Sequence, residues 1–318
     1  MLEMTAWNKE YLDALVALWN REMGEDFPMR KELFIQNSFE DVNILWDGSK
    51  IALDDSGNVI GFVVSKCFQD DSVDHMPDKT GWIQALVVDT RSQGQGVGTY
   101  LLEHAEASLR GKGMQQILLG RDTYHYFPGV PLKYEKAAQW FTSKGYDKQK
   151  TYHDLICSYD MDEVKKPSIS GVHFEWLAAD EHETLLTFMH RCFPGRWEYE
   201  AKTYFQAGGT GREFVVMKRA DKIIGFCRVN DADSPIIAQN VYWAPLFAEE
   251  MGGIGPLGID SAERGQGLGL AIVKAGIATL RERGITNIVI DWTDLVDFYK
   301  KLGYSVWKSY DSYQKEIS

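Results

Sequence analysis

The sequence predicts two α/β domains of one type, arranged in tandem along a single chain. Three observations favour this fold class. A glycine-rich turn between a strand and a helix occurs twice, a short helix ended by glycine follows each copy, and two paired strands precede each copy. The 318 residues suffice for about two domains of ordinary size. Apolar residues make up 44% and charged residues 25%, as in folded globular proteins.

Each half opens with helical patterns and continues with two strands joined by a short turn. The strands are expected at 50–55 and 59–67 in the first half, and at 213–219 and 222–230 in the second half. Residues 55–58 and 220–222 have the composition of hairpin turns. The pattern therefore predicts a strand hairpin in each domain.

The glycine-rich turn lies between a predicted strand and a predicted helix in both halves. In the first half a strand at 82–88 precedes the turn, and the helix after it places Leu101, Leu102, Ala105 and Leu109 on one face. In the second half a strand at 252–259 precedes the turn. A further strand is expected after each helix, at 115–120 and at 287–292. The two turns read Gln93-Gly94-Gln95-Gly96-Val97-Gly98-Thr99 and Arg264-Gly265-Gln266-Gly267-Leu268-Gly269-Leu270.

Both halves close alike, with short helices at 137–146 and 295–304 that end in glycine and a tyrosine. Gln93 and Arg264 are 171 residues apart, whereas Gly145 and Gly303 are 158 apart, so the first half carries 13 additional residues. They fall at 121–133, a segment with loop composition. A polar linker is expected at 166–171, which divides the chain into domains at 1–165 and 172–318.

Composition limits the partners of the protein. The formal net charge is −12 and no dense run of Lys and Arg occurs, so no nucleic-acid partner is expected. No window approaches 18 uninterrupted apolar residues, and residues 1–22 lack the features of a signal peptide. We therefore expect a cytoplasmic protein that does not enter a membrane. The scattered residues Cys67, Cys157, Cys192 and Cys227 predict reduced thiols.

A glycine turn at a helix start can bind a phosphate group. The first backbone N–H groups of a helix lack partners and carry a partial positive charge, and glycines let a ligand approach them closely. A P-loop is excluded because neither turn contains Gly-Lys-Ser/Thr. The dinucleotide fingerprint G-x-G-x-x-G also does not match. A purely structural turn is disfavoured because the pattern occurs twice in the same context, which predicts a pyrophosphate cradle in each half.

Both turns resemble the acyl-CoA signature of the GNAT acetyltransferase superfamily. That signature reads glutamine or arginine, two residues, glycine, one residue, then glycine or alanine. The proline common before the family's turn is Thr90 and Ser261 here, which departs from the pattern. The segment FYKKLGY at 298–304 is similar to a later motif of the family. The resemblance covers nearly the whole chain, so each domain is expected to have a mixed, mostly antiparallel twisted sheet with a splayed central strand pair.

The resemblance implies direct transfer of an acetyl group from acetyl-CoA to the amine of a small molecule or peptide. In this family a backbone N–H of the splayed fourth strand polarises the thioester carbonyl. The corresponding positions here are Val87 and Val88 in the first half and Gly258 and Ile259 in the second. The two cradle segments are expected to bind the cofactor.

Two differences between the halves indicate that the C-terminal domain is catalytic. Tyr299 matches the family's tyrosine near the thioester sulfur, and a phenol can protonate a departing thiolate. The first half has Phe141 at this position, which cannot donate a proton. Arg264 offers a cation to a phosphate, whereas Gln93 offers a neutral hydrogen bond. A packed core aromatic is the alternative role of Tyr299, since Phe298 and Tyr304 flank it.

The general base is the least determined part of the predicted site. Asp291 ends the late strand beside the expected splay and is the first candidate. Glu249 and Glu250 precede the fourth strand and are rival candidates. Trp292 replaces an asparagine that is frequent in the family at this place, which puts the carry-over of roles at this edge in doubt.

The additional segment at 121–133 contains the aromatic cluster Tyr124, His125, Tyr126 and Phe127. These side chains could bind or cover a substrate, or seal an interface between the domains. The sequence leaves both alternatives open. The seven histidines show no metal-ligand spacing that a carboxylate supports, so no metal site is predicted.

Three functional hypotheses remain at this stage. The first is an acetyl-CoA-dependent N-acetyltransferase whose first domain is structural or regulatory. The second is a binding module in which both halves hold acyl-CoA without transfer. In the third, both halves are active and Tyr124 or Tyr126 replaces the function that Phe141 lacks. The identity of the amine, the acyl chain length and the choice between monomer and homodimer are not encoded in these motifs.

Overall fold

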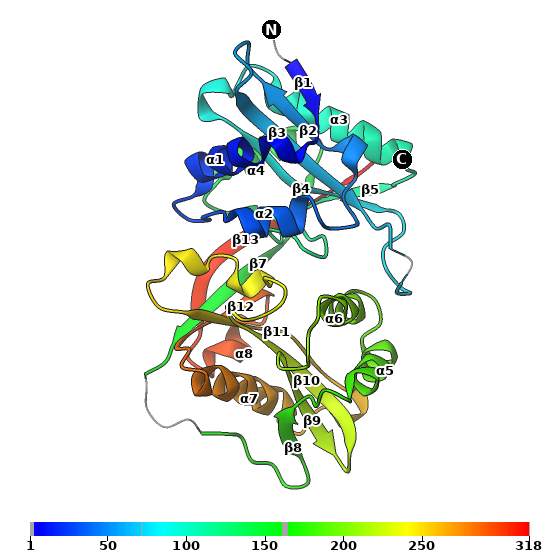
Figure 1. The fold of residues 1–318 in the computed structure, drawn as a ribbon, viewed down its shortest axis with the longest axis vertical. Coiled ribbons are helices and arrows are strands. Elements are labelled where there is room, and N and C mark those ends of the chain that lie inside the picture. Colours follow the sequence, from blue (N-terminus) through cyan, green and yellow to red (C-terminus); the bar gives the residue numbers. More distant parts are fainter. Residues whose placement is uncertain (1–2, 71, 161–164, 318) are drawn as a thin grey trace. The chain divides into compact units, whose positions relative to one another are not determined.

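The computed structural model describes residues 3–70, 72–160 and 165–317, which form two compact units (Figure 1). Unit 1 contains the described residues within 1–70, 77–152 and 309–318, and unit 2 contains those within 71–76 and 153–308. Residues 161–164, directly before the linker expected at 166–171, lie outside the described residues. The domain division at 1–165 and 172–318 follows the sequence repeat and stays a prediction.

Unit 1 combines a sheet with four α-helices and three short 3₁₀ helices among the described residues. Its elements are β1 Glu3–Ala6, η1 Lys9–Tyr11, α1 Leu12–Met23, α2 Lys31–Ser38, η2 Trp46–Gly48, β2 Lys50–Leu53, β3 Val59–Cys67, β4 Thr80–Val88, η3 Thr90–Ser92, α3 Val97–Gly111, β5 Gln116–Leu119, β6 Val130–Pro131 and α4 Glu135–Ser143. The strands follow the order β1-β2-β3-β4-β5-β13, and β6 pairs with β13.

Unit 2 repeats this arrangement. Its elements are β8 His173–Trp176, α5 His182–Cys192, α6 Arg196–Gln206, β9 Phe214–Arg219, β10 Lys222–Asn230, η4 Gln239–Val241, η5 Ala244–Leu246, β11 Met251–Ile259, η6 Ser261–Glu263, α7 Leu268–Glu282, β12 Asn287–Thr293 and α8 Val296–Lys300. The strands follow the order β8-β9-β10-β11-β12-β7. This order matches β1-β2-β3-β4-β5-β13 of unit 1 strand by strand.

The last strand of each sequence repeat completes the sheet of the other unit. Strand β7 (Asp147–Ser158) begins in unit 1, and its residues 153–158 pair antiparallel with β12 in unit 2. Strand β13 (Ser305–Glu316) begins in unit 2, and its residues 314–316 pair antiparallel with β5 in unit 1. Neither compact unit is therefore one continuous stretch of chain.

Each sheet is mixed and mostly antiparallel, as the resemblance to the GNAT superfamily implied. The parallel pairs are β4 with β5 and β11 with β12, and all other registers within the units are antiparallel. Strands β3 and β10 have the bounds expected from the sequence, 59–67 and 222–230. Their continuous apolar runs are buried on both faces, which is why the whole pattern forms strand.

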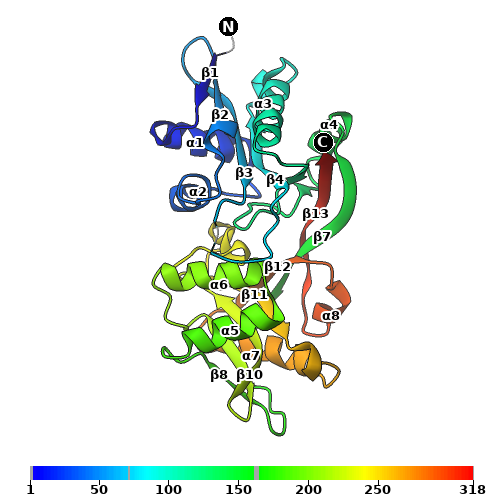
Figure 2. The ribbon, with the colours of Figure 1, turned by 90° about the vertical axis from the view of Figure 1, so that its right-hand side faces the viewer.

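Helices cover both faces of each sheet. In unit 2, Cys227 of β10 packs against Gly276 of α7, whereas the neighbouring Phe226 contacts Phe188 of α5 edge to face. Successive strand residues point to opposite faces, so α5 and α7 lie on opposite sides of the sheet. Figure 2 shows α5 and α6 crossing in front of the strands of this unit. In unit 1 the face of α3 predicted to be apolar is buried, including Leu101, Leu102, Ala105 and Leu109.

None of the described helices is long and apolar enough to cross a bilayer.

Candidate active site

The two central strands separate halfway along their length in both units. Strand β4 pairs with β5 over residues 80–83, with Ile83 opposite Leu119, and β11 pairs with β12 over residues 251–254, with Ile254 opposite Ile290. Beyond these pairs, residues 84–88 and 255–259 continue as strand along their antiparallel neighbours alone. The splayed strand pair expected from the sequence is thus present twice.

The splayed strand residues direct alternate backbone groups into the gap. Asp89 N–H donates to Ile60 O over 2.9 Å, and Asp260 N–H donates to Ile224 O over 2.8 Å. Because backbone groups alternate along an antiparallel pair, the N–H groups of the preceding residues Val88 and Ile259 point toward the gap. Val87 and Gly258 are instead paired with Phe62 and Phe226.

A glycine cradle leads from each splayed strand into a helix. Gly267 immediately precedes α7 and has a left-handed backbone with φ of 74°, and Gly96 precedes α3 with φ of 89°. A Cβ atom would contact nothing within 4 Å at either position, so the backbone there is open to a ligand. The first three amides of each helix have no intrahelical acceptor. They belong to the predicted cradle residues Val97, Gly98 and Thr99, and Leu268, Gly269 and Leu270.

The first residues of the two cradles, Gln93 and Arg264, differ in their contacts. The Gln93 side chain folds back and donates to the carbonyl oxygen of Val88 over 3.1 Å. Arg264 is exposed, and within the described residues it makes no hydrogen bond or ion pair. Gln95 donates to Arg91 O in unit 1, whereas the equivalent Gln266 accepts from Arg219 in unit 2. Arg264 is the cradle side chain that remains available to an anion.

Asp291 lies at the point where β12 separates from β11, one residue beyond the last parallel pair. Its Oδ1 atom accepts a hydrogen bond from Asn240 Nδ2 over 3.1 Å. Directly across the gap stands Gly255, where a Cβ atom would lie 3.4 Å from Asp291 Oδ1. The backbone of Gly255 has φ of 138°, which disfavours any side chain. The carboxylate therefore faces a position that the chain leaves without a side chain.

The surroundings of Asp291 favour its protonated form. Burial, and after it the carboxylates of Asp154 and Glu200, raise the pKa of Asp291 to about 7, against the opposing effect of the Asn240 amide. The residue as a whole is partly exposed. Asp291 thus carries a carboxyl group that changes charge near neutral pH.

Two neighbouring groups hold this acidic region in place. The Asp154 carboxylate accepts the backbone N–H of Trp292 over 3.0 Å, and Trp292 has a left-handed backbone with φ of 43° that is rare for a bulky residue. Arg196 pairs with Glu200 over 2.8 Å and places its guanidinium 4.7 Å from the centre of the Trp292 ring. Strained backbone of this kind persists where the surroundings enforce it, often at functional sites.

Tyr299 is buried near the end of α8, against Phe298 and Tyr304. Burial, the Cys227 thiol and the Asp291 carboxyl together raise the pKa of Tyr299 far above its ordinary value, so the phenol stays protonated. Among the described residues no hydrogen bond to its hydroxyl is present. The equivalent Phe141 packs between Trp140 and Tyr146 in the core of unit 1.

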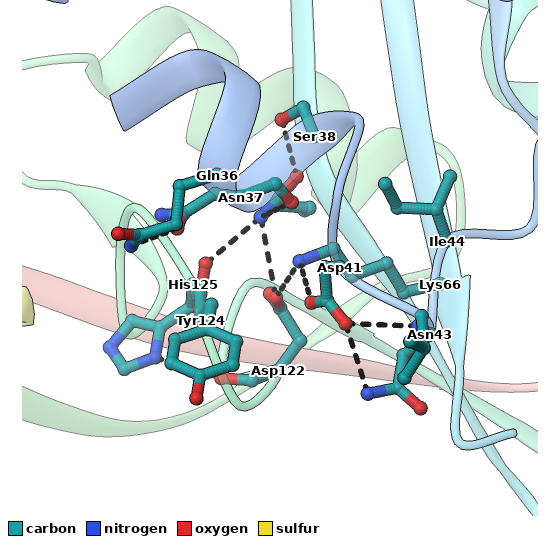
Figure 3. Close-up of polar contacts among 12 residues, drawn as sticks. Gln36, Asn37, Ser38, Asp41, Asn43, Ile44, Lys66, Asp122, Tyr124 and His125 are labelled. Atoms are coloured by element: carbon teal, nitrogen blue, oxygen red, sulfur yellow. Dashed lines mark hydrogen bonds and ion pairs between the residues drawn. The ribbon is translucent and has the colours of Figure 1, made fainter. Parts of the chain in front are cut away.

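In unit 1 buried polar side chains lie in the corresponding region, and Figure 3 shows Lys66 with its partners Asp41 and Asp122. Gln84 stands at the position of Gly255, and its amide donates to Tyr124 O over 2.9 Å and accepts from Ser38 Oγ over 2.9 Å. Gly120 stands at the position of Asp291, and a Cβ atom there would lie 2.0 Å from Phe127 O. Lys66 is fully buried and bridges Asp41 and Asp122 over 2.7 and 2.8 Å.

The aromatic segment lies in the core of unit 1. Tyr126 bonds Ser38 Oγ over 2.7 Å, and Phe127 stacks on Trp19 of α1. Tyr124 and His125 are also buried. The side chains of Tyr126 and Phe127 thus pack onto α1 and α2, and a substrate role for the four residues stays a prediction.

The rival candidates for the base lie at the other end of the strand. Glu249 and Glu250 are exposed and precede Met251, which is the first residue of β11 to pair with β12. Glu250 accepts from the backbone of Ala232, and Glu249 accepts from Asn287. Among the described residues, no three His, Cys, Asp or Glu side chains are grouped so as to hold a metal ion.

The sequence did not single out Asn240, Gly255, Asp154, Glu200 or Arg196. Gly255 carried a signal, because a proline follows it inside a predicted strand and proline there marks an irregularity. The structure has a register shift at this place in the pairing of β10 with β11. Asn240 lies in an aperiodic segment, and Asp154 comes from the exchanged strand β7.

Comparison with known proteins agrees with this architecture. The model of the acetyltransferase (GNAT) family matches the chain twice, over residues 5–126 and 182–304. Each matched range contains one splayed strand pair and one glycine cradle. The chain therefore belongs to the GNAT acetyltransferase family, in a tandem form.

Curated relatives match over part of their length. A mycothiol acetyltransferase of Nocardia farcinica (strain IFM 10152) is 33% identical over 110 residues, which are 31% of this chain and 36% of the relative. A mycothiol acetyltransferase of Renibacterium salmoninarum (strain ATCC 33209) is 32% identical over 152 residues, 46% of this chain and 39% of the relative. The chain thus spans well under half the length of these curated relatives.

Solved structures resemble the whole chain. A fungal structure described as a GCN5-related glucosamine N-acetyltransferase region of a multi-domain GH3 β-N-acetylglucosaminidase is 28% identical, with a TM-score of 0.87 over 99% of this chain and 38% of that chain. A tandem GNAT protein from the clavulanic acid biosynthesis pathway shares the fold at 13% identity, with a TM-score of 0.69 over 99% of this chain and 98% of that chain.

Proposed function

We propose that unit 2 is an N-acetyltransferase that transfers an acetyl group from acetyl-CoA to the primary amine of an amino sugar. The observation that carries this proposal is the open gap of unit 2, where Asp291 faces the side-chain-free Gly255. The names of the relatives support the reaction class. The fungal structure, 28% identical over nearly the whole chain, is described as a glucosamine N-acetyltransferase region.

The residues of unit 2 fit an acyl-CoA molecule. The open backbone at Gly265 and Gly267, the orphan amides at the start of α7 and the exposed Arg264 suit a pyrophosphate. The unpaired edge of residues 255–259 suits an extended amide-bearing chain. When bound, acetyl-CoA supplies an acetyl group activated as a thioester.

Three groups of unit 2 divide the chemical work. The N–H of Ile259, directed into the gap, donates a hydrogen bond to the carbonyl oxygen under attack. Asp291 accepts the proton that the acceptor amine loses. Tyr299 donates a proton to the departing sulfur, because its raised pKa keeps it protonated at working pH.

The raised pKa of Asp291 suits this role. A general base works best when its pKa lies near the operating pH, and the pKa of about 7 meets that condition. Because the ionised form is the active one, kcat/KM rises with pH through this value. The carboxylates of Asp154 and Glu200 nearby favour an acceptor that carries an ammonium group and hydroxyl donors, as an amino sugar does.

For unit 1 we propose binding of acyl-CoA without transfer. Its cradle has the same backbone as that of unit 2, with left-handed glycines at 94 and 96. Its gap is filled by Gln84 and the Lys66 ion pairs, and it has Phe141 where unit 2 has Tyr299. The alternative in which both halves catalyse requires Tyr124 or Tyr126 to act, and Tyr126 already bonds Ser38.

The test is release of coenzyme A thiol from acetyl-CoA in the presence of glucosamine, a polyamine or a peptide amine. We expect glucosamine to be the preferred acceptor. Tyr299→Phe should lower kcat about 10²-fold while acetyl-CoA binding stays the same. Tyr304→Phe is the matched control, since it removes a buried hydroxyl five residues away. Equal loss in both variants, or no transfer to any amine, contradicts the proposal.

A further inference from the structure

Two buried asparagines connect the Asp291 carboxyl group to the splayed strand. Asn230 ends β10 and is fully buried, and Asn240 lies in η4 with 3% of its surface exposed. Asn230 Nδ2 donates to Asn240 Oδ1 over 3.1 Å, and Asn240 Nδ2 donates to Asp291 Oδ1 over 3.1 Å. Both Nδ2 atoms also lie 3.4 Å from the carbonyl oxygen of Gly255.

The chemistry of the neighbours determines how these amides are oriented. A backbone carbonyl and a carboxylate can only accept hydrogen bonds, so the NH₂ side of each amide must face Gly255 O and Asp291. The carbonyl side of Asn240 then faces the remaining donor, Asn230 Nδ2. A flip of either amide would set oxygen against oxygen.

The short helix η4, which carries Asn240, packs closely against strand β11. A Cβ atom on Gly253 would lie 2.1 Å from Asn240 Oδ1, so the asparagine occupies the space that this glycine leaves. Asn230 Oδ1 is buried and has no hydrogen-bond partner among the described residues. A buried polar atom without a partner lowers stability, and arrangements of this kind are found where a site requires them.

We propose that Asn240, supported by Asn230, is a positioning residue whose Nδ2 group holds Oδ1 of Asp291 and leaves Oδ2 directed at the acceptor amine. This inference rests on the proposed role of Asp291 as the base. Among the described residues Oδ2 of Asp291 has no hydrogen-bond partner, so it is the atom that takes the amine proton. Asn240 also stabilises the ionised carboxylate, because it donates to it.

The other groups around Asp291 act on its ionisation from separate elements. Asp154 reaches it from β7 and Glu200 from α6, and both carboxylates disfavour its negative charge. Tyr299 of α8 interacts with it as well, and Arg196 compensates Glu200 through their ion pair. Unlike these four groups, Asn240 donates a hydrogen bond directly to the Asp291 carboxyl group. Its removal should therefore shift the ionisation toward higher pH.

The test is the pH profile of kcat/KM for glucosamine in the full chain. Asn240→Ala should move the acid limb up by about half to one pH unit, and the isosteric Asn240→Asp should move it further because it adds a negative charge. Asn230→Ala should give a smaller shift in the same direction. The acceptor amine ionises identically in all variants, so differences between profiles belong to the protein.

Asn287→Asp is the matched control, since it adds the same charge at the far end of β12 and should leave the limb in place. Thermal unfolding and the Kd for acetyl-CoA check that the variants fold. If Asn240→Ala fails to fold, Asn230→Ala and Asn240→Asp carry the test. The proposal is overturned if Asp291→Asn abolishes turnover but the acid limb of kcat/KM stays at the wild-type pH in the folded Asn230 and Asn240 variants. If Asp291→Asn is fully active, the role of Asp291 fails first and the positioning role fails with it.

Discussion

The two units share a backbone register at the splay but place their side chains on opposite strands. Positions 84 and 255 correspond, as do 120 and 291, at the same offset of 171 residues that relates the glycine turns. Unit 1 has glutamine then glycine at these places, and unit 2 has glycine then aspartate. Lys66 and Asn230 also correspond, through their pairing with Trp82 and Gly253.

This comparison shows how one scaffold gives both a packed core and a reactive site. In unit 1 the Gln84 amide fills the gap and is saturated by backbone and side-chain partners. In unit 2 the side chain comes from the neighbouring strand, so the carboxyl is held at one oxygen and faces open backbone. The cradle is kept in both units, because it depends on glycine geometry at the helix start rather than on the gap.

The largest effect on transfer is expected when residue 255 of unit 2 is replaced by the residue that unit 1 has at the corresponding position. Gly255→Gln introduces into unit 2 the residue that unit 1 carries, at a position where a Cβ atom already meets Asp291 Oδ1 at 3.4 Å. We expect transfer to fall by at least about 10²-fold, because the acceptor amine is displaced from the base. The readout is kcat/KM for glucosamine, with acetyl-CoA affinity as the control for folding. Full activity would show that the gap is not the acceptor site.

The ion pairs of unit 1 should affect stability rather than chemistry. Lys66→Met leaves Asp41 and Asp122 buried without their cation, and such a change costs about 3–5 kcal/mol of unfolding free energy. Urea unfolding measures the loss, and kcat of the folded fraction should be unchanged. Lys133→Met, which breaks an exposed pair with Asp26 in the same unit, should have little effect. A fall in kcat for Lys66→Met would assign unit 1 a part in transfer.

A smaller effect is expected on the pH dependence of stability. Since the pKa of Asp291 is raised to about 7 in the folded state, the wild type loses stability as pH rises from about 4 to 7. Asp291→Asn removes this loss, so its unfolding free energy should exceed that of the wild type by about 2–4 kcal/mol at pH 8, and by less at pH 5. Urea unfolding at the two pH values checks the sign. A difference that does not grow with pH would contradict the raised pKa.

The smallest effect is expected at the cradles. Arg264→Ala should weaken acetyl-CoA binding to unit 2 about 10-fold, since it removes a charge-assisted contact to a phosphate. Gln93→Ala should change binding to unit 1 less, because this side chain is already bonded to Val88 O. Calorimetric titration resolves the two sites by stoichiometry. If Arg264→Ala leaves both affinities unchanged, the assignment of this cradle is wrong.

Much of the scaffold could be predicted because its signals are local. The strands β3 and β10 follow from the short apolar runs at their centres and from the turn residues before them, and the cradles follow from glycines that require left-handed backbone. The position of Asp291 beside the splay also followed from the sequence, although β12 continues to Thr293 and the role of Asp291 as base stays a prediction. These features depend on residues that are neighbours along the chain.

The surroundings of Asp291 could not be predicted, because they come from distant parts of the chain. Asp154 reaches the site on the exchanged strand β7, and no local pattern indicates that this strand leaves its own repeat. Asn240 lies in a segment without periodicity, held by contacts with β11. The alternatives for the aromatic segment stayed open for the same reason, since Tyr126 and Phe127 are placed by α1 and α2.

The most direct measurement is kcat/KM for glucosamine with acetyl-CoA in Asp291→Asn and in the wild type at pH 8. The substitution keeps the shape of the side chain and removes its ability to accept a proton. We predict a fall of about 10²- to 10⁴-fold with unchanged acetyl-CoA affinity, as expected for loss of a general base. Activity within about twofold of the wild type would contradict the assignment of unit 2 as the site of transfer through Asp291.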